Sequence, residues 1–159
     1  MKKLTKILAI CLLISFAITV FASCSLLGMD LEATSIQLED KGYDVFYVED
    51  YSDTSDKNFA DLGVILGIAY VLDALDIDEE PASALVTMDD DEGFWGFEFK
   101  NAEEANDAYE DLKENWKEYT KDSKSKSTYG KSGNVVYFGT VQGVKDALGF
   151  PNSLLVFEK

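Results

Sequence analysis

The chain has 159 residues, with 30 Asp and Glu against 14 Lys, no Arg and no His, for a formal net charge of −16. Such an acidic surface repels nucleic acid and anionic lipid headgroups. Without imidazole and guanidinium groups, the chain lacks His-containing zinc sites, Ser-His and Cys-His nucleophile pairs and bidentate phosphate clamps. The content of 47% apolar and 13% aromatic residues favours a globular domain over disorder. We therefore expect a folded domain with no nucleic-acid partner and no cofactor.

The N-terminus has the layout of a secretory signal. Three Lys among the first six residues precede an uncharged, predominantly apolar run over residues 7–21, and the small residues Ala22 and Ser23 precede Cys24. This junction resembles a bacterial lipoprotein signal, in which the Cys is lipidated and becomes the first mature residue. Two or three acyl chains of the palmitate type would anchor the protein stably, since each buried methylene contributes about 0.8 kcal/mol.

These features predict a signal peptide over residues 1–23, a lipidated Cys24 with a tether to residue 30, and one domain over residues 31–159. The alternative is an uncleaved anchor, because residues 7–29 form 23 uncharged residues and about 20 span a bilayer. In both cases the N-terminal lysines stay in the cytoplasm, so the domain faces outward. Cleavage before Cys24 leaves 11 Lys against 30 acidic residues, a net charge of −19.

In the first half of the domain, apolar spacing predicts a helix over residues 31–41, which Gly42 ends, and a strand over residues 44–49. After an acidic loop, the apolar residues 62–77 predict a buried helix. They are not expected to span a membrane, because their uncharged part has only 11 residues. The GxxxG spacing of Gly63 and Gly67 is a dimerisation motif inside membrane spans. Here we interpret both glycines as allowing close packing on the sheet.

In the second half, strands are predicted over residues 84–88 and 94–99, joined by an acidic turn. Asn101 and Glu104 form a capping-box pattern ahead of a strongly periodic helix that runs to Tyr119. The Lys- and Ser-rich residues 121–132 predict a mobile loop. The remaining predictions are a strand over residues 134–139, a helix that Thr140 caps and that runs through residue 148, and an edge strand over residues 154–157.

The central order β-α-β-β-α-β predicts an α+β fold with a ferredoxin-like split core and flanking N- and C-terminal helices. Alternation along the strands makes both faces of the sheet apolar, with Trp95 and Phe97 on one face and Phe94 on the other. The two central helices cover one face. For the other face, the sequence leaves open the flanking helices, the C-terminal tail, a second subunit or a ligand.

Two groups of residues are candidates for binding. The acidic run Asp89, Asp90, Asp91 and Glu92 has carboxylates for Ca²⁺ but fails the EF-hand template, so we interpret it as a solvated turn with these four as metal candidates. The aromatic residues Tyr47, Trp95 and Tyr137 are the candidate ligand or partner face, although aromatic residues at such spacing also build cores. No residue is predicted to be catalytic.

Two segments carry a resemblance to a family. Residues 38–45 and residues 133–147 are similar to those of small uncharacterised lipoproteins of Gram-positive, Firmicutes-like bacteria. The resemblance covers most of residues 1–149. It implies an extracytoplasmic, lipid-anchored protein at the cell membrane, and it brings no catalytic residue or ligand to transfer.

The leading functional hypothesis is a non-enzymatic, lipid-anchored domain that binds or scaffolds a partner at the cell surface, through the second sheet face or by self-association. The candidate partners are a second copy in a homodimer and another envelope protein. The first alternative is a carboxylate-dependent cell-wall hydrolase, which needs two acidic groups in one cleft. The second is an acidic protein that sequesters cations or cationic peptides.

Overall fold

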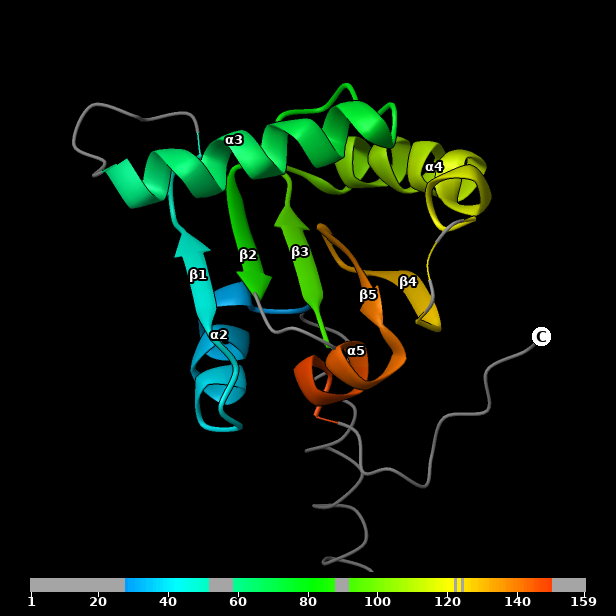
Figure 1. Ribbon diagram of the computed structural model, residues 1–159. Helices are drawn as coiled ribbons and strands as arrows, with labels where there is room; N and C mark the ends of the chain where they lie inside the picture. Colours follow the sequence, from blue (N-terminus) through cyan, green and yellow to red (C-terminus); the bar gives the residue numbers. More distant parts are fainter. Residues whose placement is uncertain (1–27, 52–58, 88–91, 122, 124, 150–159) are drawn as a thin grey trace, which may run out of the picture.

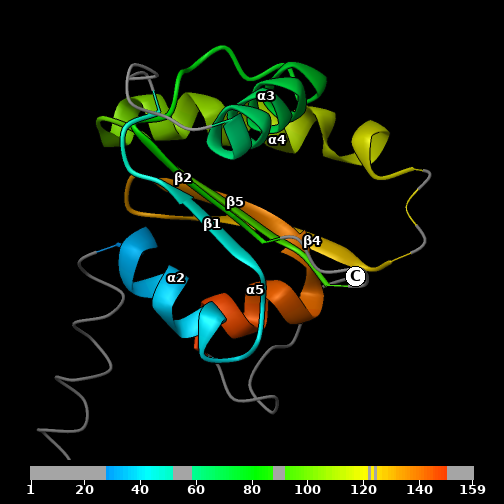
Figure 2. The same cartoon turned by 60° about the vertical axis from the view of Figure 1, so that its left-hand side comes forward.

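The computed structural model describes residues 28–51, 59–87, 92–121, 123 and 125–149. Within these residues, five antiparallel strands form one sheet between two layers of helices, as Figures 1 and 2 show. The helices are α2 (Leu31–Glu39), α3 (Phe59–Ala74), α4 (Ala102–Tyr119) and α5 (Val141–Ala147), and the strands are β1 (Val45–Val48), β2 (Ser83–Thr87), β3 (Phe94–Glu98), β4 (Ser127–Ser132) and β5 (Val135–Thr140). The predicted α+β class is confirmed.

The strand order is β1-β2-β3-β5-β4, and every neighbouring pair is antiparallel. This order does not confirm the ferredoxin-like split core in detail. In a split β-α-β unit, the two strands that the helix connects are not neighbours, because another strand lies between them. Here β1 and β2, which α3 connects, lie directly side by side, with Phe46 opposite Val86.

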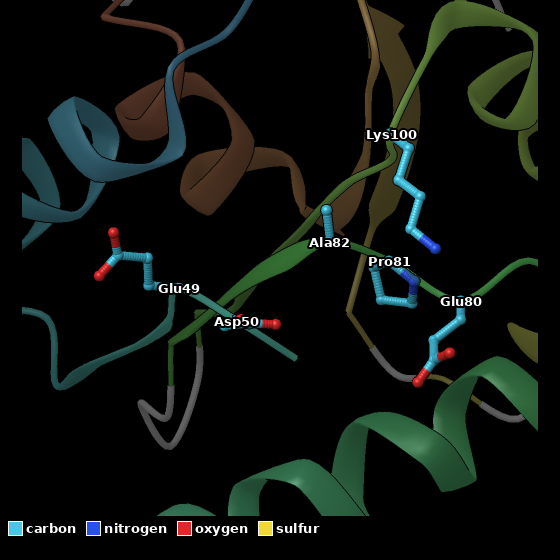
Figure 3. A pocket seen from close by; sticks show the side chains of 6 residues that line it. All are labelled: Glu49, Asp50, Glu80, Pro81, Ala82 and Lys100. Carbon is cyan, nitrogen blue, oxygen red and sulfur yellow. The ribbon is translucent and has the colours of Figure 1, made fainter. Parts of the chain in front are cut away.

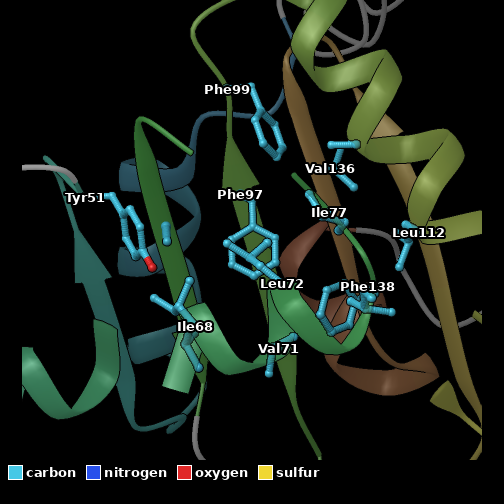
Figure 4. Close-up of a cluster of buried hydrophobic side chains, with 14 of the residues drawn as sticks. Tyr51, Ile68, Val71, Leu72, Ile77, Phe97, Phe99, Leu112, Val136 and Phe138 are labelled. Atoms are coloured by element: carbon cyan, nitrogen blue, oxygen red, sulfur yellow. The ribbon is translucent and has the colours of Figure 1, made fainter. Parts of the chain in front are cut away.

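Each face of the sheet has its own apolar core because successive side chains of a strand point to opposite faces. Phe97 is fully buried in the cluster beneath α3 and α4, together with Ile68 and Leu112, as Figure 4 shows. Phe94 is fully buried in the second cluster, against α2 and α5. The two flanking helices therefore cover the face that the sequence left open, and this face is not a free binding surface.

Side-chain caps begin three of the helices. Asp30 accepts a hydrogen bond from the Ala33 amide at the start of α2, and Thr140 accepts one from the Gly143 amide at the start of α5. Asn101 accepts from two amides of the first turn of α4, as the capping-box pattern predicts. Caps satisfy amides that have no partner within the helix, so the predicted starts of these helices are confirmed.

The prediction of a loop over residues 121–132 is wrong for its second half. Residues 127–132 form β4, which pairs along its whole length with β5. Composition predicted a loop because Lys and Ser dominate the segment, but Tyr129 packs its ring against Trp116, with 5.1 Å between ring centroids. Pairing with β5 and this ring contact with α4 outweigh the weak strand propensity of the neighbouring residues.

Several predictions lie outside the described residues: the signal segment, the turn residues Asp89 to Asp91, and the edge strand over residues 154–157. Among the helices that the structure describes, none combines the length and the apolar character needed to cross a membrane.

Candidate functional site

The outer surface of α3 is the most distinctive feature of the described part of the molecule. Leu62, Leu66 and Tyr70 follow one another at intervals of four residues and are 37%, 71% and 74% exposed. The opposite side of the same helix is buried against the sheet through Val64, Ile68, Val71 and Leu72. A helix that is apolar all round is normally buried on every side, but the residues that the structure describes cover only one side of α3.

The two glycines of α3 do not pack on the sheet, contrary to the prediction. A Cβ atom built on Gly63 or Gly67 would have no neighbour within 4 Å. Both positions therefore open toward solvent, alongside the exposed Leu66. The outer surface of α3 thus combines large apolar side chains with places where another backbone can approach closely.

Tyr119, in the last turn of α4, extends this surface. It is 38% exposed. Burial raises the pKa of its phenol, and the nearby Tyr70 raises this pKa further. Its ring is stacked on Trp116, with 6.0 Å between the ring centroids, so it is held in place. We call Leu62, Leu66, Tyr70 and Tyr119 the α3 surface; among the described residues, Ile36 on α2 is the one other exposed large apolar side chain.

The structure does not bring Tyr47, Trp95 and Tyr137 together on one face. Tyr47 and Tyr137 lie on the face that α2 and α5 cover, where they are partly buried. Tyr137 stacks on Phe94 at 6.2 Å between ring centroids, and burial raises the pKa of its phenol. Trp95 belongs to the opposite core, with its ring stacked on that of Phe138 at 6.1 Å. All three are packing residues of the sheet.

Two open hollows lie beside the C-terminal end of β1. The first, of about 530 Å³, is lined by Glu49, Asp50, Glu80, Pro81, Ala82 and Lys100. In Figure 3, Glu49 and Asp50 come from the end of β1 and Lys100 from the connection between β3 and α4. Three carboxylates and one ammonium attract a small cation or zwitterion without enclosing it, so we assign this hollow no chemistry.

The second hollow, of about 340 Å³, is lined mainly by the loop that follows α3. One of its lining residues, Glu79, has a carboxylate oxygen that is buried and makes no hydrogen bond among the described residues. Burial raises the pKa of the Glu79 carboxyl, and the like charge of Asp111 adds to this shift. Burial also raises the pKa of Asp111, with a contribution from Asp76. Among the described carboxyl groups, those of Glu79 and Asp111 most resemble an acid-base pair.

Glu92, one of the metal candidates, belongs to a hydrogen-bond network on the side of the sheet that α2 and α5 cover. The phenol of the buried Tyr43 lies 3.0 Å from a Glu92 carboxylate oxygen and 2.9 Å from one of Asp146. Asp146 also forms a 2.8 Å ion pair with Lys41. Burial raises the pKa of the Tyr43 phenol, and its two carboxylate partners add to this. The network fastens the α2–β1 connection to α5.

The described residues contain no group of three or more potential ligands that could hold a metal ion. Asp89, Asp90 and Asp91 lie outside these residues. No family, no curated protein and no solved structure matches the chain. The resemblance to small lipoproteins therefore stays a prediction.

Sequence reasoning missed the α3 surface as a candidate site. The signal was present, since Leu62, Leu66 and Tyr70 recur every fourth residue in a helix whose other side is also apolar. Such a helix has more apolar surface than one side of a sheet can cover.

Proposed function

We propose that this protein is a lipid-anchored, extracytoplasmic domain that has no catalytic role and binds a protein at the cell surface through the α3 surface. The observation that carries this proposal is the exposure of large apolar side chains along one helix of a strongly acidic protein. Exposed apolar patches of this kind mark protein interaction sites in soluble domains. The second sheet face, an earlier candidate for the same role, is covered by α2 and α5.

The proposed anchor also has a defined attachment point on the domain. Gly28 packs against Gly133 in the turn between β4 and β5, and the Met29 amide donates to the Ser132 carbonyl at 3.5 Å. Gly28 lies four positions after Cys24, which is at most about 14 Å of extended chain. A lipid on Cys24 would therefore hold the β4–β5 turn close to the membrane.

Replacing the proposed lipid-bearing residue tests the anchor. We expect Cys24→Ala to abolish incorporation of labelled palmitate and to move the protein from the membrane fraction to the soluble fraction or the medium. Cys11→Ala is the matched control, because Cys11 is the only other Cys and lies inside the apolar run. It should leave both readouts unchanged. A Cys24→Ala protein that stays fixed in the membrane would contradict lipidation and favour an uncleaved anchor.

A second candidate function has one observation in its favour. The raised pKa values of Glu79 and Asp111 are the kind of perturbation found in acid-base catalysts, and a cell-wall hydrolase would use such a pair. If this alternative holds, Glu79→Gln should lower the part of cell-wall turnover that depends on this protein by at least about 10²-fold. The control is Glu32→Gln, at an exposed position on the far helix layer. Unchanged turnover in Glu79→Gln removes the hydrolase hypothesis.

A further inference from the structure

We propose that the partner of the α3 surface is a cationic amphipathic helix of another protein. Its apolar residues would lie on Leu62, Leu66 and Tyr70, and its Lys or Arg side chains would meet the carboxylates at the C-terminal end of α3. The inference rests on the proposed function, because it names the chemistry of the partner that the same surface would bind. The continuity of the surface, the charge of the layer around it and an unpartnered carboxylate oxygen beside it support this partner.

The exposed line of α3 ends at an acidic hollow. Leu62, Leu66 and Tyr70 follow one another at intervals of four residues, and Asp73, seven residues after Leu66, continues on the same side of the helix. Asp73 is exposed, and with Ala69 it lines the hollow of about 340 Å³. Leu66 and Asp73 are about 10 Å apart along the helix axis. A helix with apolar residues at the same spacing and a basic residue one to two turns further on matches this surface.

The helix layer that carries this surface is more acidic than the opposite layer. Figures 1 and 2 show α3 and α4 on one face of the sheet and α2 and α5 on the other. Residues 62–80 have five carboxylates and no Lys, and α4 has seven carboxylates and two Lys, which gives a net charge of −10. In contrast, α2 and α5 together have three carboxylates and one Lys, a net charge of −2. The field of the α3–α4 layer repels a second copy of the chain and anionic lipid, and it attracts a partner of opposite sign.

The carboxylates that line the hollow form no ion pair among the described residues, because the three ion pairs found there involve other acidic residues. One carboxylate oxygen of Glu79 is buried and makes no hydrogen bond within the same residues. Burial raises the pKa of the Glu79 carboxyl, and the like charges of Asp111 and Asp107 raise it further. An ammonium or guanidinium group in the hollow would donate hydrogen bonds to these acceptors and offset their mutual repulsion.

The apolar contact is too small to hold a partner without this charge. With 16 residues, α3 is about 24 Å long and about 10 Å wide, a footprint of about 240 Å². A standard interface takes about 800 Å² from each partner. The carboxylates must therefore contribute, and salt weakens their contribution because it screens exposed charges. We expect a weak complex whose dissociation constant rises at least about tenfold between about 0.05 M and about 0.5 M NaCl.

Synthetic peptides test the proposal on the full-length protein in nanodiscs of phosphatidylcholine. The probe is a fluorescent helix of about 18 residues, with Leu at intervals of three and four residues and Lys and Ala elsewhere. One control peptide has the same composition in scrambled order, which keeps the charge but removes the apolar side. In the other, Glu replaces Lys, which keeps the apolar side but reverses the charge. After subtraction of binding to empty nanodiscs, the probe should bind at least about tenfold more tightly than either control.

A variant in the middle of α3 tests the apolar contact. Leu66→Gln should weaken binding of the probe by about tenfold, because it removes a large apolar side chain from the contact. Ile36→Gln is the matched control, at a position 57% exposed on the opposite helix layer, and should change binding less than about twofold. Leu66 is itself 71% exposed, so its replacement leaves the core intact.

A double variant tests the charged contact. Asp73→Asn with Asp76→Asn should weaken binding by about tenfold at low salt and reduce its salt dependence, because two of the facing charges are lost. Asn suits the positive φ of Asp76, and both side chains are exposed. Glu39→Gln with Asp40→Asn, at exposed positions at the end of α2, removes the same charge from the opposite layer and should have less than about a third of the effect.

Three results would overturn the proposal. The probe would fail to bind, or the scrambled peptide would bind equally well, which would show attraction to charge alone. Equal binding of the Glu-containing peptide would show that charge does not select the partner.

Photo-cross-linking in cells, from benzoylphenylalanine in place of Leu66, separates these results from failure of the proposed function. A cross-linked envelope protein whose contact segment is not basic would support the proposed function and remove the cationic partner. Absence of any cross-linked protein would contradict both.

Discussion

Replacing Gly139 with Ala is expected to destabilise the domain by about 1–3 kcal/mol, and by more if the backbone cannot yield. A Cβ atom at this position would lie 2.1 Å from the carbonyl oxygen of Gly93 and 3.0 Å from the Cα atom of Phe94. Both neighbours are backbone atoms in the paired region of β3 and β5, where Phe94 lies opposite Gly139. The Thr140 amide also donates to the same Gly93 carbonyl at 2.9 Å, so that oxygen cannot move away without loss of a hydrogen bond.

The matched control is the same change at Gly67 in α3. A Cβ atom there meets nothing within 4 Å, so Gly67→Ala should stabilise the domain by about 0.5–1 kcal/mol through helix propensity. Urea unfolding followed by Trp fluorescence measures both variants. Opposite shifts of the midpoint are expected. A Gly139→Ala midpoint equal to that of the unchanged protein would contradict the close packing of β5 on the Gly93 backbone.

The order and type of most elements were predictable from local signals. Periodic apolar residues and side-chain caps identified α2, α4 and α5, since a cap such as Asn101 acts within one turn of its helix. The strand β4 was missed because its stability comes from pairing with β5 and from the contact of Tyr129 with Trp116. Neither is encoded in the composition of residues 127–132.

The sheet order was not predictable for a related reason. The pattern β-α-β states that a helix separates two strands, but not whether those strands become neighbours. Here the pairing of Phe46 with Val86 makes β1 and β2 direct neighbours, and the expected split arrangement does not form in detail. Strand neighbours depend on contacts between residues far apart in sequence.

The prediction that Tyr47, Trp95 and Tyr137 share one face was wrong because it depended on the register between strands. The alternation of side chains along β3 correctly placed Phe94 and Trp95 on opposite faces of the sheet. It did not show which face each residue of β5 shares with them. The register places Trp95 opposite Phe138 and Gly96 opposite Tyr137, and opposite residues share a face. Tyr137 therefore lies on the Phe94 side of the sheet and Trp95 on the other. The exposed side of α3 was equally undetermined, because a helix that is apolar all round does not indicate which side faces the sheet.

The largest expected effects on stability come from removing the Phe at the centre of either core. Phe97→Ala should cost about 3–5 kcal/mol, because it deletes a large buried side chain and leaves a cavity. Phe97 is fully buried, and its ring centroid lies 5.8 Å from that of Phe138. Phe94 is equally buried on the other face, so Phe94→Ala should cost about the same. A typical domain has only about 5–15 kcal/mol of stability, so either change is severe.

Comparing the two variants tests whether the layers unfold together. Both tryptophans, Trp95 and Trp116, pack in the core beneath α3 and α4, so their fluorescence reports one face of the sheet. The two cores share the strands β1, β2, β3 and β5 of that sheet, so Phe94→Ala should lower the fluorescence midpoint as much as the far-ultraviolet circular dichroism midpoint, as a two-state transition requires. A fluorescence transition that Phe94→Ala leaves unchanged would show that α2 and α5 detach separately. That result would expose the second sheet face and make Tyr47 and Tyr137 available to a partner after all.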